Sequence, residues 1–228
     1  VDGYNDTIDL AVGLTVTDEG VHADFTGTSP TCANGVNVPL TYAHAYFSYA
    51  MLVALAPEMP SNWASLAAFT VSAPAGCILN AKHPEPVAVR HVIGHFVTDL
   101  CLGAVAPVLP EVVPAEGAGA LWNFQVSARA SDPSSGLPPR EVLMFNSGGT
   151  GARPTLDGIS ATAFPSGVRT MPAEATEQSG PVVVWRKELR PNSGGEGRQR
   201  GGLGQVIEIG PAEGYDCLLY TSPSPRDL

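Results

Sequence analysis

Residues 10–27 read LAVGLTVTDEGVHADFTG and contain two alternating runs of apolar and polar side chains on either side of Asp18-Glu19-Gly20. Alternation with a period of two is typical of β-strands whose two faces differ in polarity. Glycine at the turn can take the positive φ angle that a tight hairpin requires. We therefore expect a β-hairpin here, with Gly20 in its turn.

Two helices are predicted after this hairpin. Residues 39–56, PLTYAHAYFSYAMLVALA, place apolar side chains three and four positions apart, with proline near the start and Pro57 just past the end. A second pattern of this kind covers residues 86–105 and is closed by Pro107. Between them, residues 67–73 alternate like a strand.

The second half of the chain has a different character. Strand patterns cover residues 121–128, 141–145, 182–189 and 204–209, and turn-rich stretches of glycine, proline and serine separate them. No period of about 20 to 50 residues recurs, so the sequence does not support a solenoid or propeller. We expect one continuous α+β unit, with a mixed or antiparallel sheet, two main helices and glycine-rich loops in the C-terminal half.

Composition limits the classes of function. The 228 residues include 12 Lys and Arg against 22 Asp and Glu, for a net charge of −10, so a nucleic-acid partner is not expected. No apolar run approaches the roughly 18 residues of a membrane span. The four cysteines form no C-x-x-C pair, so zinc or disulfide scaffolds are not indicated and a reducing, cytoplasmic compartment is expected.

Both ends of the chain look like interruptions. Residues 217–228, CLLYTSPSPRDL, abandon the preceding strand pattern and resemble one reading frame of a transposon-type sequencing adaptor. We expect this segment to be a foreign, unstructured tail, with a natural disordered tail as the alternative. The first residue is valine, and acidic residues stand where a secretory signal would be basic. Residues 1–216 are therefore expected to be the C-terminal portion of a larger domain.

Two glycine segments are candidates for anion binding: residues 147–153, SGGTGAR, and residues 193–204, SGGEGRQRGGLG. Backbone N–H groups in such turns can hold an anion, and Arg153, Arg198 or Arg200 could add a guanidinium. Neither segment matches a nucleotide-binding signature. The alternative is that both are only tight connections between strands.

Other polar residues allow two interpretations each. His91, His95 and Asp99 would share one face of the second helix, a geometry that suits either a metal ion or helix packing. Apolar neighbours on that face and the lack of an H-E-x-x-H pattern favour packing, so no metal site is predicted on this chain. Asp24 could orient a loop or contact a ligand. No G-x-S-x-G elbow is present.

Taken in order, six segments resemble the hydantoinase B/oxoprolinase family. The resemblance covers about residues 3–209 and departs at residues 61–65, SNWAS, where the family usually has an Asn-x-Gly loop followed by Arg-Pro. The matching segments are residues 24–29 (DFTGTS), 74–80 (PAGCILN), 103–115, 148–154 (GGTGARP), 157–167 (DGISATAFPSG) and 193–204.

The resemblance implies an ATP-dependent amidohydrolase that opens a five-membered lactam or cyclic imide, such as 5-oxoproline or an N-substituted hydantoin. It implies that a hydantoinase A type partner binds ATP and that a divalent metal motif lies upstream of Val1, so this chain alone is expected to be inactive. The implied catalytic residues are Asp24, Arg153 and Asp157. The implied substrate or phosphate contacts are Gly148, Gly149, Gly151, Ser166 and Arg198.

In these roles Arg153 and the glycine backbone would donate to the phosphorylated carbonyl oxygen, and Asp157 or Asp24 would position water or the ring N–H. Two other functions stay open. One is a subunit of an acetone or acetophenone carboxylase. The other is a non-catalytic scaffold for an ATP-binding partner, in which the glycine loops are only turns.

Overall fold

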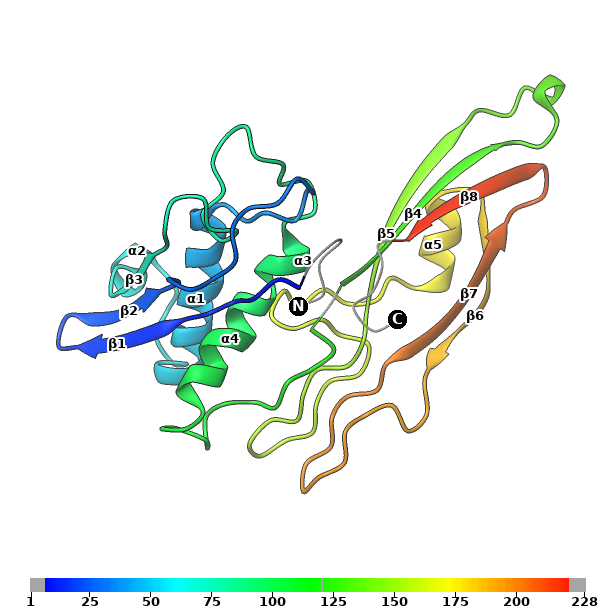
Figure 1. Ribbon diagram of the computed structural model, residues 1–228. Coiled ribbons are helices and arrows are strands. Elements are labelled where there is room, and N and C mark those ends of the chain that lie inside the picture. Colours follow the sequence, from blue (N-terminus) through cyan, green and yellow to red (C-terminus); the bar gives the residue numbers. More distant parts are fainter. Residues whose placement is uncertain (1–6, 120, 222–228) are drawn as a thin grey trace. The chain divides into compact units, whose positions relative to one another are not determined.

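The computed structural model describes residues 7–119 and 121–221, and the chain divides into two compact units, residues 1–114 and 115–228 (Figure 1). We refer to them as unit 1 and unit 2. The sequence predicted one continuous domain over residues 1–216, which stays a prediction. In the part of the chain that the structure describes, no sheet is shared between the two halves, and each half has its own buried side chains.

The sheet of unit 1 has three strands in the order β1-β2-β3. Strands β1 (Gly13–Thr17) and β2 (Gly20–Asp24) form the predicted hairpin, which is confirmed. Gly20 has a φ of 144°, and a Cβ atom there would lie 2.0 Å from the carbonyl oxygen of Ala68. Only glycine fits at this position. Strand β3 (Phe69–Ser72) pairs with β2 in parallel.

The helices of unit 1 are α1 (Leu40–Leu55), α2 (Trp63–Leu66), α3 (His91–Gly94) and α4 (Phe96–Val105). Helix α1 agrees with the prediction and follows directly on Pro39. The second predicted helix begins later than residue 86. The backbone N–H of Val89 donates to the carbonyl of Gly35, which holds the segment before α3 in turns.

Helix α1 packs against both β3 and α4, as Figure 1 shows. Unit 1 also has fully buried apolar side chains, and each of them contributes about 1.5 to 3 kcal/mol through the area removed from water. They include Phe25, Phe47, Met51, Ile78, Leu79, Ile93 and Val97. Large side chains therefore hold unit 1 together.

Unit 2 contains two antiparallel sheets. The first has the order β5-β4-β8, with β4 at Leu121–Ala130, β5 at Arg140–Ser147 and β8 at Tyr215–Thr221. The second is the hairpin of β6 (Val182–Leu189) and β7 (Gln205–Pro211). A short 3-10 turn, η1 (Pro133–Ser135), and helix α5 (Ala173–Ser179) complete the unit. Its core is Val126, Val142, Met144 and Val182.

The four strands predicted in this half are confirmed as β4 to β7, whereas β8 and α5 were not predicted. The tail expected to be unstructured from residue 217 has a strand over Cys217–Thr221, because the backbone of β8 pairs with β4. Residues 222–228 lie outside the described residues. The foreign origin of the tail stays a prediction.

The α+β class is confirmed, with mixed pairing in the first sheet and antiparallel pairing in the others. Over the described ranges 7–119 and 121–221, no helix combines the length and the apolar character that crossing a membrane requires.

Candidate functional site

The two glycine segments that the sequence predicts as candidate sites meet in unit 2. There they join two further stretches in what we call the glycine junction, which consists of residues 115–118, 149–153, 157–161 and 200–204. The backbone N–H of Gly202 donates to the carbonyl of Thr150 at 2.9 Å, and the N–H of Thr150 donates to Ile159 at 2.9 Å. Ala115 donates to Ala152 at 2.8 Å. Four stretches of backbone are thus bonded directly to one another.

Glycine is required where these stretches touch. A Cβ atom on Gly149 would lie 1.9 Å from the carbonyl oxygen of Gly202, and one on Gly151 would lie 1.6 Å from that of Ala115. Real Cβ atoms do not come so close to backbone oxygen, so neither position accepts a side chain without movement of the backbone. The glycines serve close packing of main chain on main chain.

Hydroxyl side chains complete the glycine junction. Thr150 Oγ1 accepts from the N–H of Ile159 at 2.7 Å and donates to the carbonyl of Gly151 at 3.3 Å. Ser160 Oγ accepts from the N–H of Leu203 at 3.0 Å. Sequence reasoning missed these two residues. A serine or threonine beside a glycine was the available signal, but the partners lie about 10 and 40 positions away in the chain.

The internal bonds change the expected role of the loops. The N–H groups of Thr150, Arg153, Gly158 and Gly202 donate to carbonyl oxygens inside unit 2, so these four are not donors for an anion. Gly149 and Gly151 accept through their carbonyls. The glycine junction is therefore a support for side chains, and the charged side chains on it are the groups that a ligand would meet.

Hydrogen bonds hold the side chain of Arg153. Its Nε and Nη2 atoms donate to the carbonyl oxygen of Asp157 at 3.0 and 2.7 Å, and its backbone N–H donates to Leu156 at 2.9 Å. The guanidinium plane is fixed by two bonds while the residue remains exposed. Within the described part of the chain these bonds engage Nε and Nη2 alone, which leaves the N–H groups of Nη1 for a ligand.

Asp157 holds two parts of the site in place. Its carbonyl receives the Arg153 guanidinium, and its Oδ1 atom accepts from the backbone N–H of Arg200 at 2.8 Å. The N–H of Gly158 donates back to the carbonyl of Arg200 at 2.7 Å. Asp157 thus connects the loop of Arg153 to the loop of Arg200 by hydrogen bonds. The predicted residues Arg153 and Asp157 are in direct contact.

Positive charge concentrates here. Residues 148–160 and 190–204 contain four arginines and two acidic residues, in a chain whose net charge is −10. The four arginines are exposed: Arg153, Arg190, Arg198 and Arg200. A local excess of positive charge on an acidic protein directs anions to this region.

Ser166, also predicted for this site, is half-buried in a turn, where its Oγ accepts from the N–H of Val168 at 3.5 Å.

Asp24 lies in unit 1, so the predicted catalytic set is divided between the two units. Its Oδ1 atom accepts from the N–H and hydroxyl of Thr26 at 3.1 and 2.8 Å and from Ser72 Oγ at 3.3 Å. The bonds from Thr26 are the largest cause that lowers the pKa of Asp24; Ser72 and the charge of His22 add to the effect, and burial opposes it. The carboxylate thus remains ionised at neutral pH.

The rest of the DFTGTS segment stabilises the fold. Phe25 is fully buried. Thr28 Oγ1 accepts from the N–H of Ala11 at 2.9 Å and donates to its carbonyl at 3.0 Å. Ser29 Oγ accepts from the N–H of Asp9 at 2.9 Å. The hydroxyls of this segment therefore fasten residues 9–11 to the unit.

The histidines predicted at one helix face are part of the packing between helices. His95 is 2% exposed, and its ring centroid lies 5.4 Å from that of Tyr46 and 6.1 Å from that of His91. Burial, and secondarily His91, lowers the pKa of His95 to about 4. Among the described residues no three His, Cys, Asp or Glu side chains gather as a metal site would require.

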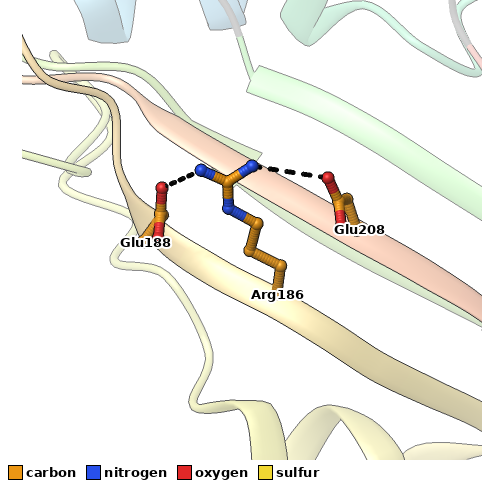
Figure 2. A network of polar contacts seen from close by, with 3 residues as sticks. All are labelled: Arg186, Glu188 and Glu208. Carbon is orange, nitrogen blue, oxygen red and sulfur yellow. Dashed lines mark hydrogen bonds and ion pairs between the residues drawn. The ribbon is translucent and has the colours of Figure 1, made fainter.

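Within the described ranges Arg186, unlike Arg153, is paired with carboxylates. On the β6–β7 hairpin, Arg186 makes ion pairs with Glu188 and, at 3.5 Å, with Glu208 (Figure 2). These bonds raise the pKa of Arg186 and lower that of Glu188. Two carboxylates therefore offset this charge, whereas the guanidinium of Arg153 is held by a neutral carbonyl.

Comparison with known proteins gives a family match. The family model described as Hydantoinase B/oxoprolinase matches residues 1–222. A protein of Pseudomonas sp. (strain NS671), named as a subunit of a D-/L-hydantoinase, is 30% identical over 224 residues, which cover 92% of this chain and 37% of that protein. The 5-oxoprolinase 1 of Arabidopsis thaliana is 32% identical over 188 residues, covering 82% of this chain and 14% of that protein.

Two solved structures share the fold. A nucleotide-free acetone carboxylase has a TM-score of 0.76 at 19% identity and covers 93% of this chain and 29% of its own. The ATP-dependent caprolactamase from Pseudomonas jessenii has a TM-score of 0.74 at 23% identity, covering 89% and 35%. The chain thus spans between 14% and 37% of the length of these four proteins.

Proposed function

The chain belongs to the hydantoinase B/oxoprolinase family, and we propose that it is the anion-binding part of an ATP-dependent enzyme that opens a cyclic amide. The observation that carries the proposal is Arg153: an exposed guanidinium whose plane is fixed by the carbonyl of Asp157 and whose charge is not offset by a carboxylate within the described residues. A guanidinium held in this way is suited to an anionic oxygen.

The chemistry of ring opening explains why such a group is needed. Amide resonance protects the carbonyl of a lactam or imide, and ATP supplies a phosphoryl group that turns its oxygen into part of a leaving group. Arg153 would bind the oxygens that become negative, with Arg198 and Arg200 raising the local positive potential. Asp157 would act by holding Arg153 and the loop of Arg200 in position.

The substrate we propose is a five-membered lactam or cyclic imide, such as 5-oxoproline or a hydantoin. Support comes from the names of similar proteins, of which one refers to hydantoin and one to oxoproline. The caprolactamase, whose fold is similar, is named for another cyclic amide. Asp24 is proposed as the carboxylate that handles a proton of the ring nitrogen or of water.

The N–H groups of Thr150, Arg153, Gly158 and Gly202 are bonded within unit 2, so they are not free to donate to the phosphates of ATP. We therefore propose that a hydantoinase A type subunit or domain binds ATP. The relative from Pseudomonas is itself named as a subunit, which supports an assembly. Because no three metal-ligating side chains cluster among the described residues, no step is assigned to a metal held by this chain.

The test is an activity assay of the full-length protein assembled with its ATP-binding partner. We expect Arg153→Ala to lower ATP-dependent ring opening about 100-fold, the usual effect of removing one preorganised donor, with partial recovery in Arg153→Lys. Arg186→Ala is the matched control, since it removes an exposed arginine of the same unit that is paired elsewhere. Parental turnover in Arg153→Ala would refute the proposal.

The same assembly separates the two other functions that the sequence left open. A carboxylase would consume bicarbonate and a ketone, and it would leave cyclic amides intact. A scaffold would show parental turnover per intact complex in Arg153→Ala, with the loss confined to complex stability. The proposed hydrolase predicts loss of turnover in complexes that remain assembled.

A further inference from the structure

The first sheet has one apolar face and one polar face. In the parallel pair of β2 and β3, His22 lies opposite Thr70 and Asp24 lies opposite Ser72. The alternate residues Val21, Ala23 and Phe69 are buried, and β3 packs against α1. Because side chains alternate along a strand, the four polar side chains share the other face of the sheet, where they are half-buried or exposed.

These side chains form one continuous hydrogen-bonded chain. Thr70 Oγ1 lies 2.8 Å from His22 Nδ1, His22 Nε2 lies 2.9 Å from Ser72 Oγ, and Ser72 Oγ donates to Asp24 Oδ1 at 3.3 Å. A hydroxyl carries a single proton. Since Ser72 gives its proton to Asp24, Nε2 of His22 must be the donor to Ser72.

We propose that His22, Ser72 and Asp24 form a proton relay, in which His22 and Ser72 are positioning residues that supply Asp24 with the proton it gives to the ring nitrogen. This inference rests on the proposed function. Sequence reasoning treated Asp24 alone, because nothing in the chain marks contacts between residues about 50 positions apart.

Each proton is accounted for in the relay. The His22 imidazolium gives its Nε2 proton to Ser72 Oγ while the hydroxyl proton of Ser72 passes to Asp24 Oδ1. His22 is then neutral, with Nδ1–H donating to Thr70. As the C–N bond of the ring breaks, its electron pair goes to nitrogen, which takes the proton from Asp24. An acid in the solvent, such as a buffer acid, then gives a proton to His22 and keeps the electron pair as its conjugate base, and the resting state is restored.

The surroundings of His22 are suited to this role. Its register partner on β1 is Thr15 and its partner on β3 is Thr70, so both flanking positions carry uncharged hydroxyls and Asp24 is the carboxylate that its charge acts on. Two other histidines are placed differently. The ring of His44 donates to the carbonyl of Phe69 at 2.6 Å, and His95 is buried between helices.

The first experiment uses NMR on the isotope-labelled 228-residue chain. We expect long-range ¹⁵N spectra to show a proton on Nε2 of His22 and the carboxyl ¹³C titration of Asp24 to move to higher pH in Ser72→Ala and in His22→Gln. Ser72→Thr should restore the parental curve, because it keeps the hydroxyl in a strand that tolerates β-branched residues. Thr15→Ala is the matched control and should leave the titration unchanged.

A His22 ring that carries its proton on Nδ1 alone, or an Asp24 titration that ignores both substitutions, overturns the relay. The second experiment follows ring opening against pH in the assembled enzyme. We expect Ser72→Ala and His22→Gln to lose the same limb of the pH profile, and Ser72→Thr to keep it. Parental profiles in both, alongside loss of turnover in Arg153→Ala, would overturn the relay and leave the proposed function standing.

Discussion

The two units carry different kinds of residue, although they are of equal length. Unit 1 has all five histidines, ten acidic and two basic residues, and eight of the 25 glycines. Unit 2 has no histidine, twelve acidic and ten basic residues, and the other 17 glycines. All the histidines thus lie in unit 1, and most of the basic residues lie in unit 2.

The difference extends to what stabilises each unit. In unit 1, large side chains such as Phe47 and Met51 fill the space between α1, α4 and the sheet. In unit 2, the loops that carry the candidate site are joined by backbone contacts at positions such as Gly149 and Gly151. A core of side chains tolerates small adjustments, whereas a contact between two backbones does not tolerate an added Cβ.

The largest effect is expected from Gly149→Ala. The new Cβ would start 1.9 Å from the carbonyl oxygen of Gly202, so the two loops must separate, at a cost of about 3 kcal/mol or more to folding. Hydrogen exchange in urea, read separately on peptides from residues 7–114 and 121–221, should show the loss in unit 2.

Gly195→Ala is the control for this substitution, because a Cβ there meets nothing within 4 Å. It should leave both units at parental stability. Equal urea midpoints for Gly149→Ala and Gly195→Ala would mean that the loops of unit 2 are not joined as described.

The next effect is a dependence of stability on pH that is confined to unit 1. The pKa of His95 is about 4 in the folded chain, against an ordinary value of about 6.5. Between these values the unfolded chain binds a proton that the folded chain excludes, so stability falls as pH falls from about 6.5 to about 4, by up to about 3 kcal/mol. Above pH 6.5 this group has no effect.

The measurement is urea unfolding at about pH 7 and about pH 4.5, followed by exchange in peptides from α4. His95→Gln should remove most of the difference between the two pH values, since an amide does not titrate there. A parental chain whose α4 peptides are equally protected at both pH values would contradict the burial of His95 as a neutral ring.

A smaller effect is expected from Thr150→Val. The substitution keeps the shape of the side chain but removes the hydroxyl that accepts from the N–H of Ile159 at 2.7 Å. An N–H left without its acceptor costs about 1 to 2 kcal/mol, and the loss should appear in unit 2. Thr155→Val, at an exposed position of the same loop, should have no measurable effect on the urea midpoint. Equal urea midpoints for the two variants would show that the Thr150 hydroxyl does not stabilise the glycine junction.

Local patterns were sufficient to predict most elements of the fold. The hairpin of β1 and β2 follows from alternation and from Gly20, and α1 follows from apolar spacing between two prolines. Strand β8 was missed because residues 217–228 were set aside as foreign. The helix predicted from residue 86 begins at His91, because a bond from Val89 to Gly35, 54 positions away, overrides local preference.

The candidate site could be predicted only in part. Residues 147–153 and 193–204 were identified as chemically distinctive, but the sequence does not show that Gly149 and Gly202 touch. The hydrogen bonds between these loops use up backbone donors that an isolated loop would offer to an anion, while side chains such as that of Arg153 stay exposed. The same limit applies to His22 and Ser72, which are joined only by the parallel pairing of β2 and β3.

The most direct measurement of the central claim is a titration of the 228-residue chain with inorganic phosphate, followed through the arginine Nε–H resonances. Our account predicts saturable shifts of Arg153 and of the arginines on the loop of Arg200, while Arg186, paired with Glu188 and Glu208, stays unchanged. Shifts that do not saturate, or that are as large at Arg186 as at Arg153, would contradict an anion site on the glycine junction.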